Sequence, residues 1–176
     1  MNKNIFLIVF CTVLFSSFSV FADDGQVKIS ISAKVTASTC VVVSDSSSSV
    51  VQMISSSLTN ISIGTPFGQT PFSISLDYCP PTTSVAHVKF TGISDTDMPN
   101  LLKLDSAGDG YAKGIALGLY DENQQNLDIR SNSTDFKLNS TVVRNKLGFI
   151  VAYVRTLPES SQGKVSATAS FEISYD

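Results

Sequence analysis

Residues 164–175 read KVSATASFEISY, and in this stretch apolar and polar side chains alternate one by one up to the penultimate residue of the chain. An alternation with a period of two places every apolar side chain on one face of an extended strand. Residues 27–35, VKISISAKV, have the same period and are the cleanest such pattern in the sequence. Two long amphipathic strands are therefore predicted, one near each end of the chain.

The rest of the sequence also has the character of a β-protein. The chain holds 11 Phe, 5 Tyr and no Trp, and turn-forming residues recur at short intervals, whereas helical periodicity is hard to find. Further strands are predicted at residues 39–43, 50–53, 59–63, 72–78, 85–93, 114–120, 136–138 and 149–156. Many short strands with this spacing favour an all-β sandwich of the immunoglobulin type.

The N-terminus predicts a secretory signal peptide over residues 1–22. A basic residue, Lys3, precedes a short apolar run, and Ala22 is a small residue at the expected cleavage site. A membrane anchor is the competing interpretation, but serines interrupt the apolar run before it reaches the ~20 residues that a spanning helix needs. We therefore expect an exported chain that is not embedded in a membrane.

The charge balance argues against a nucleic-acid partner. The chain carries 12 basic and 15 acidic residues, a net charge of −3, whereas nucleic acids and anionic lipids require clustered Lys and Arg. No partner of either kind is expected.

Two cysteines, Cys40 and Cys79, remain once Cys11 leaves with the signal peptide. Exported proteins fold in an oxidising compartment, so two thiols favour one disulfide. A zinc site is the alternative, but His87 is the only histidine and neither cysteine lies in a Cys-x-x-Cys pair. No metal or cofactor is expected.

Few residues suggest catalysis or ligand binding. His87 could serve as the base of a hydrolase, but it occupies an alternating position in the predicted strand at 85–93, which favours a strand-surface residue. A second set of residues, the acidic side chains of one loop region, lacks the spacing of a calcium loop; its members are Asp95, Asp97, Asp105 and Asp109. The sequons at Asn60, Asn132 and Asn139 discriminate little, because Ser- and Thr-rich β-proteins produce them by chance. The protein is predicted not to be an enzyme.

Several motifs give the chain a resemblance to a known family. An alternating segment precedes the first cysteine, LDYCP (76–80) surrounds the second, and VKFTG (88–92), NLLKL (100–104) and KGIALGLYD (113–121) follow. Near the end, Gly163 is followed by the alternating stretch and the penultimate Tyr175. In these features the chain resembles the pilins of the chaperone–usher pathway, and within them the minor, tip-adaptor subunits of type 1-like fimbriae.

The resemblance implies an incomplete immunoglobulin-like sandwich that a strand from a neighbouring subunit completes. Residues 37–176 would form the pilin domain and residues 23–36 an N-terminal extension that serves as the donor strand. The side chains inserted into the neighbour would be Val27, Ile29, Ile31, Ala33 and Val35. Ala33 stands where many pilins have glycine. The final strand would border the acceptor groove and contact the chaperone through Gly163, Phe171, Ile173, Tyr175 and Asp176.

The partners that the resemblance implies are the neighbouring pilus subunits, a periplasmic pilus chaperone and the outer-membrane usher. The chain would pass through the periplasm to the cell surface and become part of an extracellular fimbrium. A single-domain fimbrial adhesin that binds a host glycan or receptor is the alternative function, and a secreted hydrolase is a further one from another class.

Overall fold

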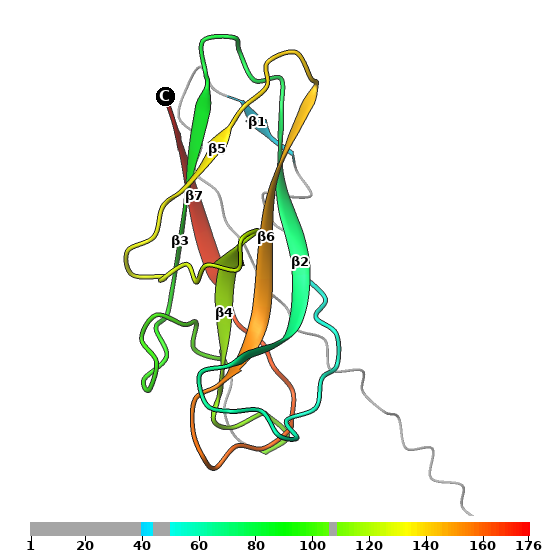
Figure 1. Cartoon of the computed structure of the whole chain (residues 1–176), viewed down its shortest axis with the longest axis vertical. Coiled ribbons are helices and arrows are strands. Elements are labelled where there is room, and N and C mark those ends of the chain that lie inside the picture. Colours follow the sequence, from blue (N-terminus) through cyan, green and yellow to red (C-terminus); the bar gives the residue numbers. More distant parts are fainter. Residues whose placement is uncertain (1–39, 44–49, 106–108) are drawn as a thin grey trace, which may run out of the picture.

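The computed structural model describes residues 40–43, 50–105 and 109–176 of the chain. All regular elements in this part are β-strands, and Figure 1 shows them as long ribbons running along the molecule. The seven strands are β1 (Val41–Val42), β2 (Pro66–Asp77), β3 (Val85–Gly92), β4 (Ile115–Asp121), β5 (Thr134–Lys137), β6 (Arg144–Arg155) and β7 (Ala169–Tyr175). Among the described residues no helix is long and apolar enough to cross a membrane.

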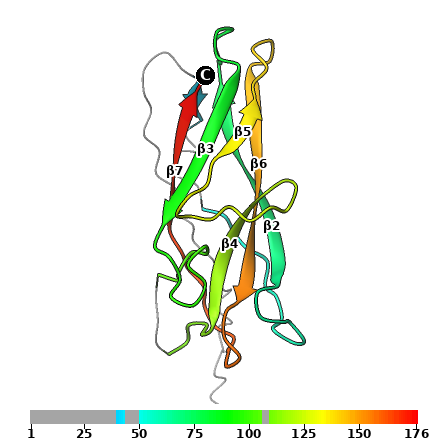
Figure 2. The same ribbon diagram turned by 60° about the vertical axis from the view of Figure 1, so that its left-hand side comes forward.

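The strands form two sheets that pack face to face. One sheet has the order β1-β2-β6-β4 and the other has the order β5-β3-β7, with all five strand pairs antiparallel. Figure 2 shows β7 at the border of the smaller sheet, beside β3. This two-layer arrangement confirms the prediction of an all-β, immunoglobulin-like sandwich.

The core lies between the two sheets and is rich in aromatic rings. Phe90 of β3 and Phe149 of β6 are almost completely buried and meet edge to face, with ring centroids 4.9 Å apart. Phe136 of β5 adds a third ring, 5.2 Å from Phe149. Edge-to-face pairs of this kind stabilise a core beyond the burial of their surface area, so the rings join the two layers.

The observed strands differ from the predicted ones mainly where glycine and proline occur inside a strand. The prediction began a strand at residue 72, but β2 begins at Pro66 and contains Gly68, whose φ is +57°. The pairing of β2 with β6 shifts between Phe67 and Thr70, so Gly68 belongs to a β-bulge within the strand. Pro66 and Gly68, which are residue types that usually mark turns, therefore lie inside a continuous strand.

Two predicted strands, 50–53 and 59–63, are not strands in the structure. In the first, Val51 and Met53 are buried and alternate with exposed neighbours, as a strand would require, but the backbone makes no ladder. The predicted strand at 164–175 is regular only from Ala169 onward. Side-chain alternation therefore identified the buried face correctly and overestimated the length of the ladder.

Candidate functional site along the last strand

Within the described part of the chain, the last strand, β7, is hydrogen-bonded to a neighbouring strand on one edge only. Its partner is β3, in a register that pairs Phe171 with Phe90 and Tyr175 with Ala86. Beyond the strand, the Asp176 amide donates to the Val85 carbonyl over 3.1 Å. No described strand pairs with the other edge of β7. Among the described residues, β7 thus has one satisfied edge and one edge free to accept a strand.

The inward face of β7 is apolar along its whole length. Phe171 and Ile173 are buried, and the same face continues upstream through Ala169, Ala167 and Val165. Tyr175 is partly buried, burial raises the pKa of its phenol, and its hydroxyl oxygen has no hydrogen-bond partner among the described residues. The family prediction had placed three of these residues, Phe171, Ile173 and Tyr175, on the strand bordering a groove, and all three lie on β7.

A pocket of about 360 Å³ opens where the chain approaches β7. It lies between residues 55–58 on one side and residues 161–165 on the other. The aromatic rings of Phe67 and Tyr153, with centroids 5.4 Å apart, are part of its wall. Tyr153 donates its hydroxyl to the Ile54 carbonyl over 3.2 Å, and burial raises the pKa of this phenol.

Buried apolar residues line the inside of this pocket, and exposed polar residues form its border. Ala112, Ile115 and Val165 are buried, whereas the serine-rich residues 55–57 and residues 161–163 are exposed. A concave apolar surface bordered by polar groups fits an apolar side chain better than a charged one. The serines at 55–57 contribute part of this polar border.

Gly163 borders the pocket because the chain passes very close to another segment there. A Cβ atom at this position would overlap the backbone carbonyl carbon of Tyr111 and the backbone nitrogen of Ala112. Two backbone hydrogen bonds keep these segments close: the Ala112 N–H donates to the Lys164 carbonyl over 3.0 Å, and the Lys164 N–H donates to the Gly110 carbonyl over 2.8 Å. Only glycine fits without displacing backbone, which is a physical reason for the glycine that the family pattern marked.

Near the other end of β7, a histidine of the neighbouring strand β3 lies between two carboxylates. His87 of β3 contacts the Asp135 carboxylate through Nδ1 at 2.7 Å and the Asp176 carboxylate through Nε2 at 2.8 Å. Hydrogen bonds to Asp135 and then to Asp176 raise the pKa of the imidazole. His87 therefore holds the C-terminal residue against the sheet and lies on a strand, as predicted.

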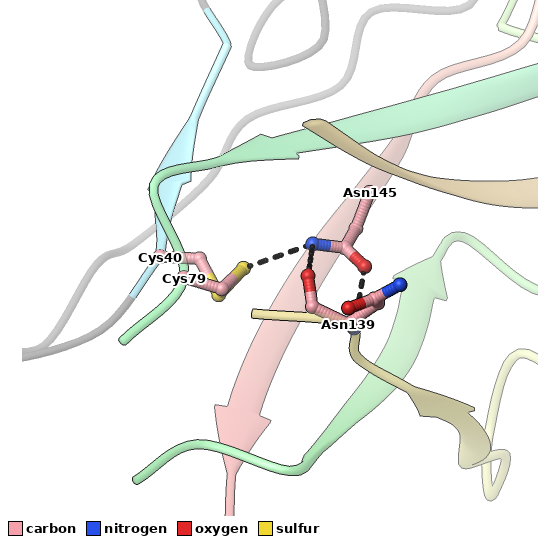
Figure 3. The surroundings of a disulfide bond; sticks show 4 residues. All are labelled: Cys40, Cys79, Asn139 and Asn145. Carbon is pink, nitrogen blue, oxygen red and sulfur yellow. Dashed lines mark hydrogen bonds between the residues drawn. A yellow bond between two sulfur atoms is a disulfide. The ribbon is translucent and has the colours of Figure 1, made fainter. Parts of the chain in front are cut away.

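The disulfide predicted from the cysteine count is present and joins β1 to the end of β2. Cys40 and Cys79 are bonded, and Asn145 of β6 donates its side-chain amide toward the Cys79 sulfur over 3.6 Å (Figure 3). The same amide donates to the Asn139 carbonyl, while its oxygen accepts the Asn139 N–H.

Two predicted segments lie outside the described residues. They are the signal peptide and the strand predicted to be donated to a neighbour, with its side chains Val27, Ile29, Ile31, Ala33 and Val35.

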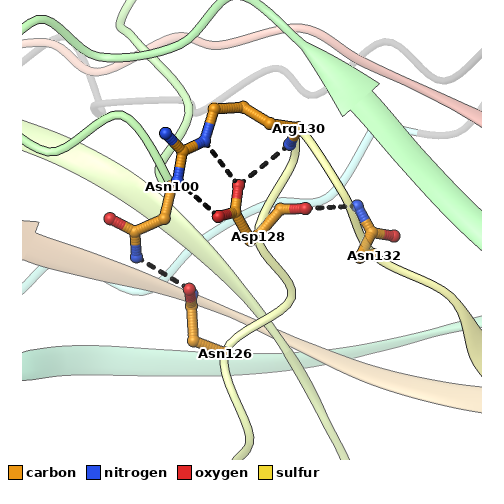
Figure 4. Close-up of polar contacts among 5 residues, drawn as sticks. All are labelled: Asn100, Asn126, Asp128, Arg130 and Asn132. Carbon is orange, nitrogen blue, oxygen red and sulfur yellow. Dashed lines mark hydrogen bonds and ion pairs between the residues drawn. The ribbon is translucent and has the colours of Figure 1, made fainter.

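Sequence reasoning missed a buried asparagine that fixes the long connection before β5. Asn132 accepts the Phe90 N–H and donates to the Phe90 carbonyl, both over 2.7 Å, and it also donates to the Asp128 carbonyl. Figure 4 shows Asp128 paired in turn with Arg130, which lowers the pKa of the carboxyl to about 2. The sequence indicated Asn132 only as a possible glycosylation site. In the structure its amide nitrogen is buried and donates to two backbone carbonyls.

Two of the four acidic residues considered as a calcium site, Asp95 and Asp105, have hydrogen-bond partners within the protein. Asp95 accepts the N–H groups of Asp97 and Met98, which stabilises a turn. Asp105 accepts the Thr168 hydroxyl over 2.9 Å. No group of metal-binding side chains occurs within the part of the chain that the structure describes.

Comparisons with known proteins were made by sequence and by structure. The model of the fimbrial protein family matches residues 29–176. The chain is similar to the uncharacterized fimbrial-like protein YcbV of Escherichia coli K12, with 32% identity across the full length of both chains. It is also similar to a protein of Escherichia coli O157:H7 described as "Probable major fimbrial subunit LpfA", with 30% identity over 90% of this chain and 88% of the other.

Solved structures of pilus proteins have the same architecture. An antigen and type I fimbria protein of Burkholderia pseudomallei is 28% identical and superimposes with a TM-score of 0.60, covering 86% of this chain and 97% of the other. The rod subunit PapA of the P pilus superimposes with a TM-score of 0.62 at 17% identity, over 78% of this chain and 99% of the other. The second likeness is one of fold alone.

Proposed function

The chain belongs to the fimbrial protein family of chaperone–usher pilins, and on this basis we propose that it donates residues 23–36 to one neighbour and accepts a strand from another along β7. As a fimbrial subunit it is a structural component of a surface pilus, and its partners are other pilus subunits. Residues 37–176 would be the domain that accepts, and residues 1–22 the signal peptide removed on export.

The observation that carries this proposal is the free edge of β7 together with the pocket beside it. An unpaired strand edge presents backbone N–H and C=O groups that invite pairing with another chain. A donated strand satisfies these groups and places alternate side chains into the groove. The apolar inward face of β7 and the 360 Å³ pocket are suited to receive such side chains.

The donor segment has the composition that this groove requires. Val27, Ile29, Ile31 and Val35 would supply four large apolar side chains and Ala33 a small one. Burial of four such groups contributes on the order of 6 to 12 kcal/mol before the cost of ordering the segment. This gross stabilisation is sufficient to hold two subunits together.

The direction of the donated strand follows from the pairing preferences of the sandwich. Every pair of named strands in the structure is antiparallel, and antiparallel ladders are slightly more stable per residue. An antiparallel donor would place its last residue, the equivalent of Val35, beside the start of β7, where the pocket lies. We propose that this side chain fills the pocket.

We propose the periplasmic chaperone and the outer-membrane usher as the partners that act before assembly. A chaperone strand would cover the free edge of β7 during transit through the periplasm, and basic residues of the chaperone would bind the C-terminal carboxylate of Asp176. Asp176 is exposed and therefore accessible to such a contact. Within the pilus, the short N-terminal extension favours a minor, tip-adaptor position. We also propose that the role of the subunit is structural and that it has no catalytic activity.

Thermal unfolding tests whether the domain needs a donated strand. Residues 36–176 are compared alone and with residues 25–35 attached to the C-terminus through a flexible linker. We expect a large rise in melting temperature in the fused form, and a much smaller one when Ile29 and Ile31 in the attached segment are replaced by Ser. Equal melting temperatures for all three forms would contradict strand donation.

A further inference from the structure

We propose that an exposed apolar patch beside the disulfide is the surface on which the next pilin domain packs, namely the domain that accepts this chain's N-terminal strand. The apolar end patch, as we call it, consists of Val41, Tyr78, Val142 and Val143. The inference rests on the proposed function, because the N-terminal segment determines which domain lies against the patch.

The four residues lie together at one end of the larger sheet. β1 begins at Val41 and β6 begins next to Val143, while Tyr78 directly follows β2. Val41 is paired with Asp77, and the Tyr78 N–H donates to the Val143 carbonyl over 3.0 Å. Figure 1 shows these strand ends close to one another at the end of the molecule where the chain's C-terminus also lies.

These side chains are unusually exposed for apolar residues. Tyr78 is 71% exposed, Val143 63%, Val41 55% and Val142 41%. Single exposed apolar residues are common, but a contiguous group indicates a contact surface. Tyr78 also has a φ of +54°, which is uncommon for an aromatic residue. The backbone therefore accepts strain at the position that places a large ring in solvent.

The patch is held rigidly by the groups beneath it. Asn145 connects the Cys79 sulfur to Asn139, and the Asn139 carboxamide accepts both the N–H and the hydroxyl of Thr141. The turn that carries Val142 and Val143 is thereby fixed to the disulfide, and Figure 3 shows the contacts of Asn145 with Cys79 and Asn139. A preorganised surface loses little conformational entropy when a partner binds.

The charges next to the patch neutralise each other. Arg144 donates to the Asp77 carboxylate through two nitrogens, at 2.7 and 2.8 Å, so the two side chains form a bidentate ion pair. An apolar surface with its neighbouring charges internally paired favours an uncharged, largely apolar partner surface over a nucleic acid or an acidic polymer.

The length of the chain before Cys40 determines which partner can reach the patch. If residues 23–36 are inserted in another domain, four residue steps separate Thr36 from Cys40, and they span at most about 14 Å. Cys40 itself is bonded to Cys79, the neighbour of Tyr78. The accepting domain must then lie directly against this end of the molecule, where the apolar end patch is.

Site-specific photo-cross-linking tests the inference in cells that assemble the pilus from the full-length chain. A benzoylphenylalanine is placed at position 78, and in a control at position 73, because Ser73 is also exposed but lies in the middle of β2, paired with Gly148 and away from both ends of the sandwich. We expect position 78 to give a cross-link to a second pilin and position 73 to give none. A second comparison, Tyr78→Asp against Ser73→Asp, should lower the dissociation temperature of subunit complexes only for the first.

The outcomes separate this inference from the proposed function. Complexes joined by a donated strand are expected to survive SDS without heating, because the inserted side chains are buried. Their presence is therefore scored independently of the cross-link. If such complexes form but position 78 does not cross-link, or cross-links no more than position 73, the patch inference is wrong and strand donation stands. If no SDS-resistant complexes form with the unmodified chain, the proposed function is wrong and the inference falls with it.

Discussion

Gly163 illustrates how a missing side chain shapes the candidate groove. The residue borders the pocket, and the backbone of Tyr111 and Ala112 occupies the space that a Cβ atom would need. Backbone cannot rotate away as a side chain does. The glycine therefore allows residues 161–165 to lie close to the segment before β4, and this closeness forms one wall of the pocket.

Gly163→Ala is expected to lower the free energy of unfolding by about 1 to 3 kcal/mol, because the added methyl displaces packed backbone. Gly148→Ala is a matched control, since the three atoms nearest to its Cβ would all belong to the side chain of Glu122, which is exposed and able to move. That control should change stability by less than about 1 kcal/mol. Urea unfolding of both variants measures the difference, and equal losses would show that the close approach is unimportant.

His87 gives a pH-dependent prediction that is simple to measure, because it is the only histidine in the chain. Its pKa is raised above the usual value of about 6.5, first by Asp135 and then by Asp176. The stabilisation is therefore fully present below about pH 6.5 and is lost as the pH rises through the pKa of the folded protein.

NMR titration of the imidazole should give a pKa above 6.5 in the unmodified protein. Asp135→Asn should reduce this pKa more than Asp176→Asn does, whereas Asp97→Asn, in a distant loop, should leave it unchanged. A value at or below 6.5 in the unmodified protein would show that the two carboxylates do not hold the protonated ring.

At the scale of elements, the two strands at the ends of the described chain are attached very differently. β7 is paired to β3 over its whole length, whereas β1 has only two residues and pairs with the end of β2. Such a short strand cannot hold the start of the domain by hydrogen bonds alone. The disulfide between Cys40 and Cys79 supplies the missing attachment.

Replacement of both cysteines by serine should lower the free energy of unfolding by about 4 kcal/mol in the chain-entropy model, because the disulfide closes a loop with a sequence separation of 39. The slope of the urea transition should also rise, since the unfolded chain exposes more surface without the cross-link. Unfolding of the unmodified protein with and without reductant is the companion measurement. An unchanged midpoint would contradict this role of the disulfide.

The sequence predicted the faces of these elements better than their boundaries. Alternation correctly marked Phe171 and Ile173 as buried, because the period of two is a direct consequence of strand geometry. It could not show that residues 50–53 alternate without joining a ladder, since hydrogen bonding depends on which segments lie alongside. The pocket beside Gly163 could not be predicted either, because its walls come from five separate parts of the chain.

For the whole molecule, the proposed strand donation would make the subunit directional. One end would accept a strand and the other would give one, and a heterologous contact of this kind repeats into an open fibre unless something stops it. The two proposed activities would use different residues, so they should be separable by mutation. A subunit that can accept but not give would occupy one end of a chain of subunits and prevent growth there.

Ile31→Asp should produce such a subunit. The donated strand would have to bury a carboxylate without a partner, which costs several kcal/mol, while the accepting domain, which begins after the donor segment, is untouched. Ser32→Asp adds the same charge to the opposite face of the segment and serves as the matched control. Co-expressed with the unmodified chain, the Ile31→Asp subunit should enter SDS-resistant complexes only as an acceptor and shorten the fibres seen by electron microscopy, whereas Ser32→Asp should leave their length unchanged. Equal shortening by both variants would indicate that added charge, and not insertion of alternate side chains, limits assembly, because only Ile31 lies on the face that the proposed donation buries.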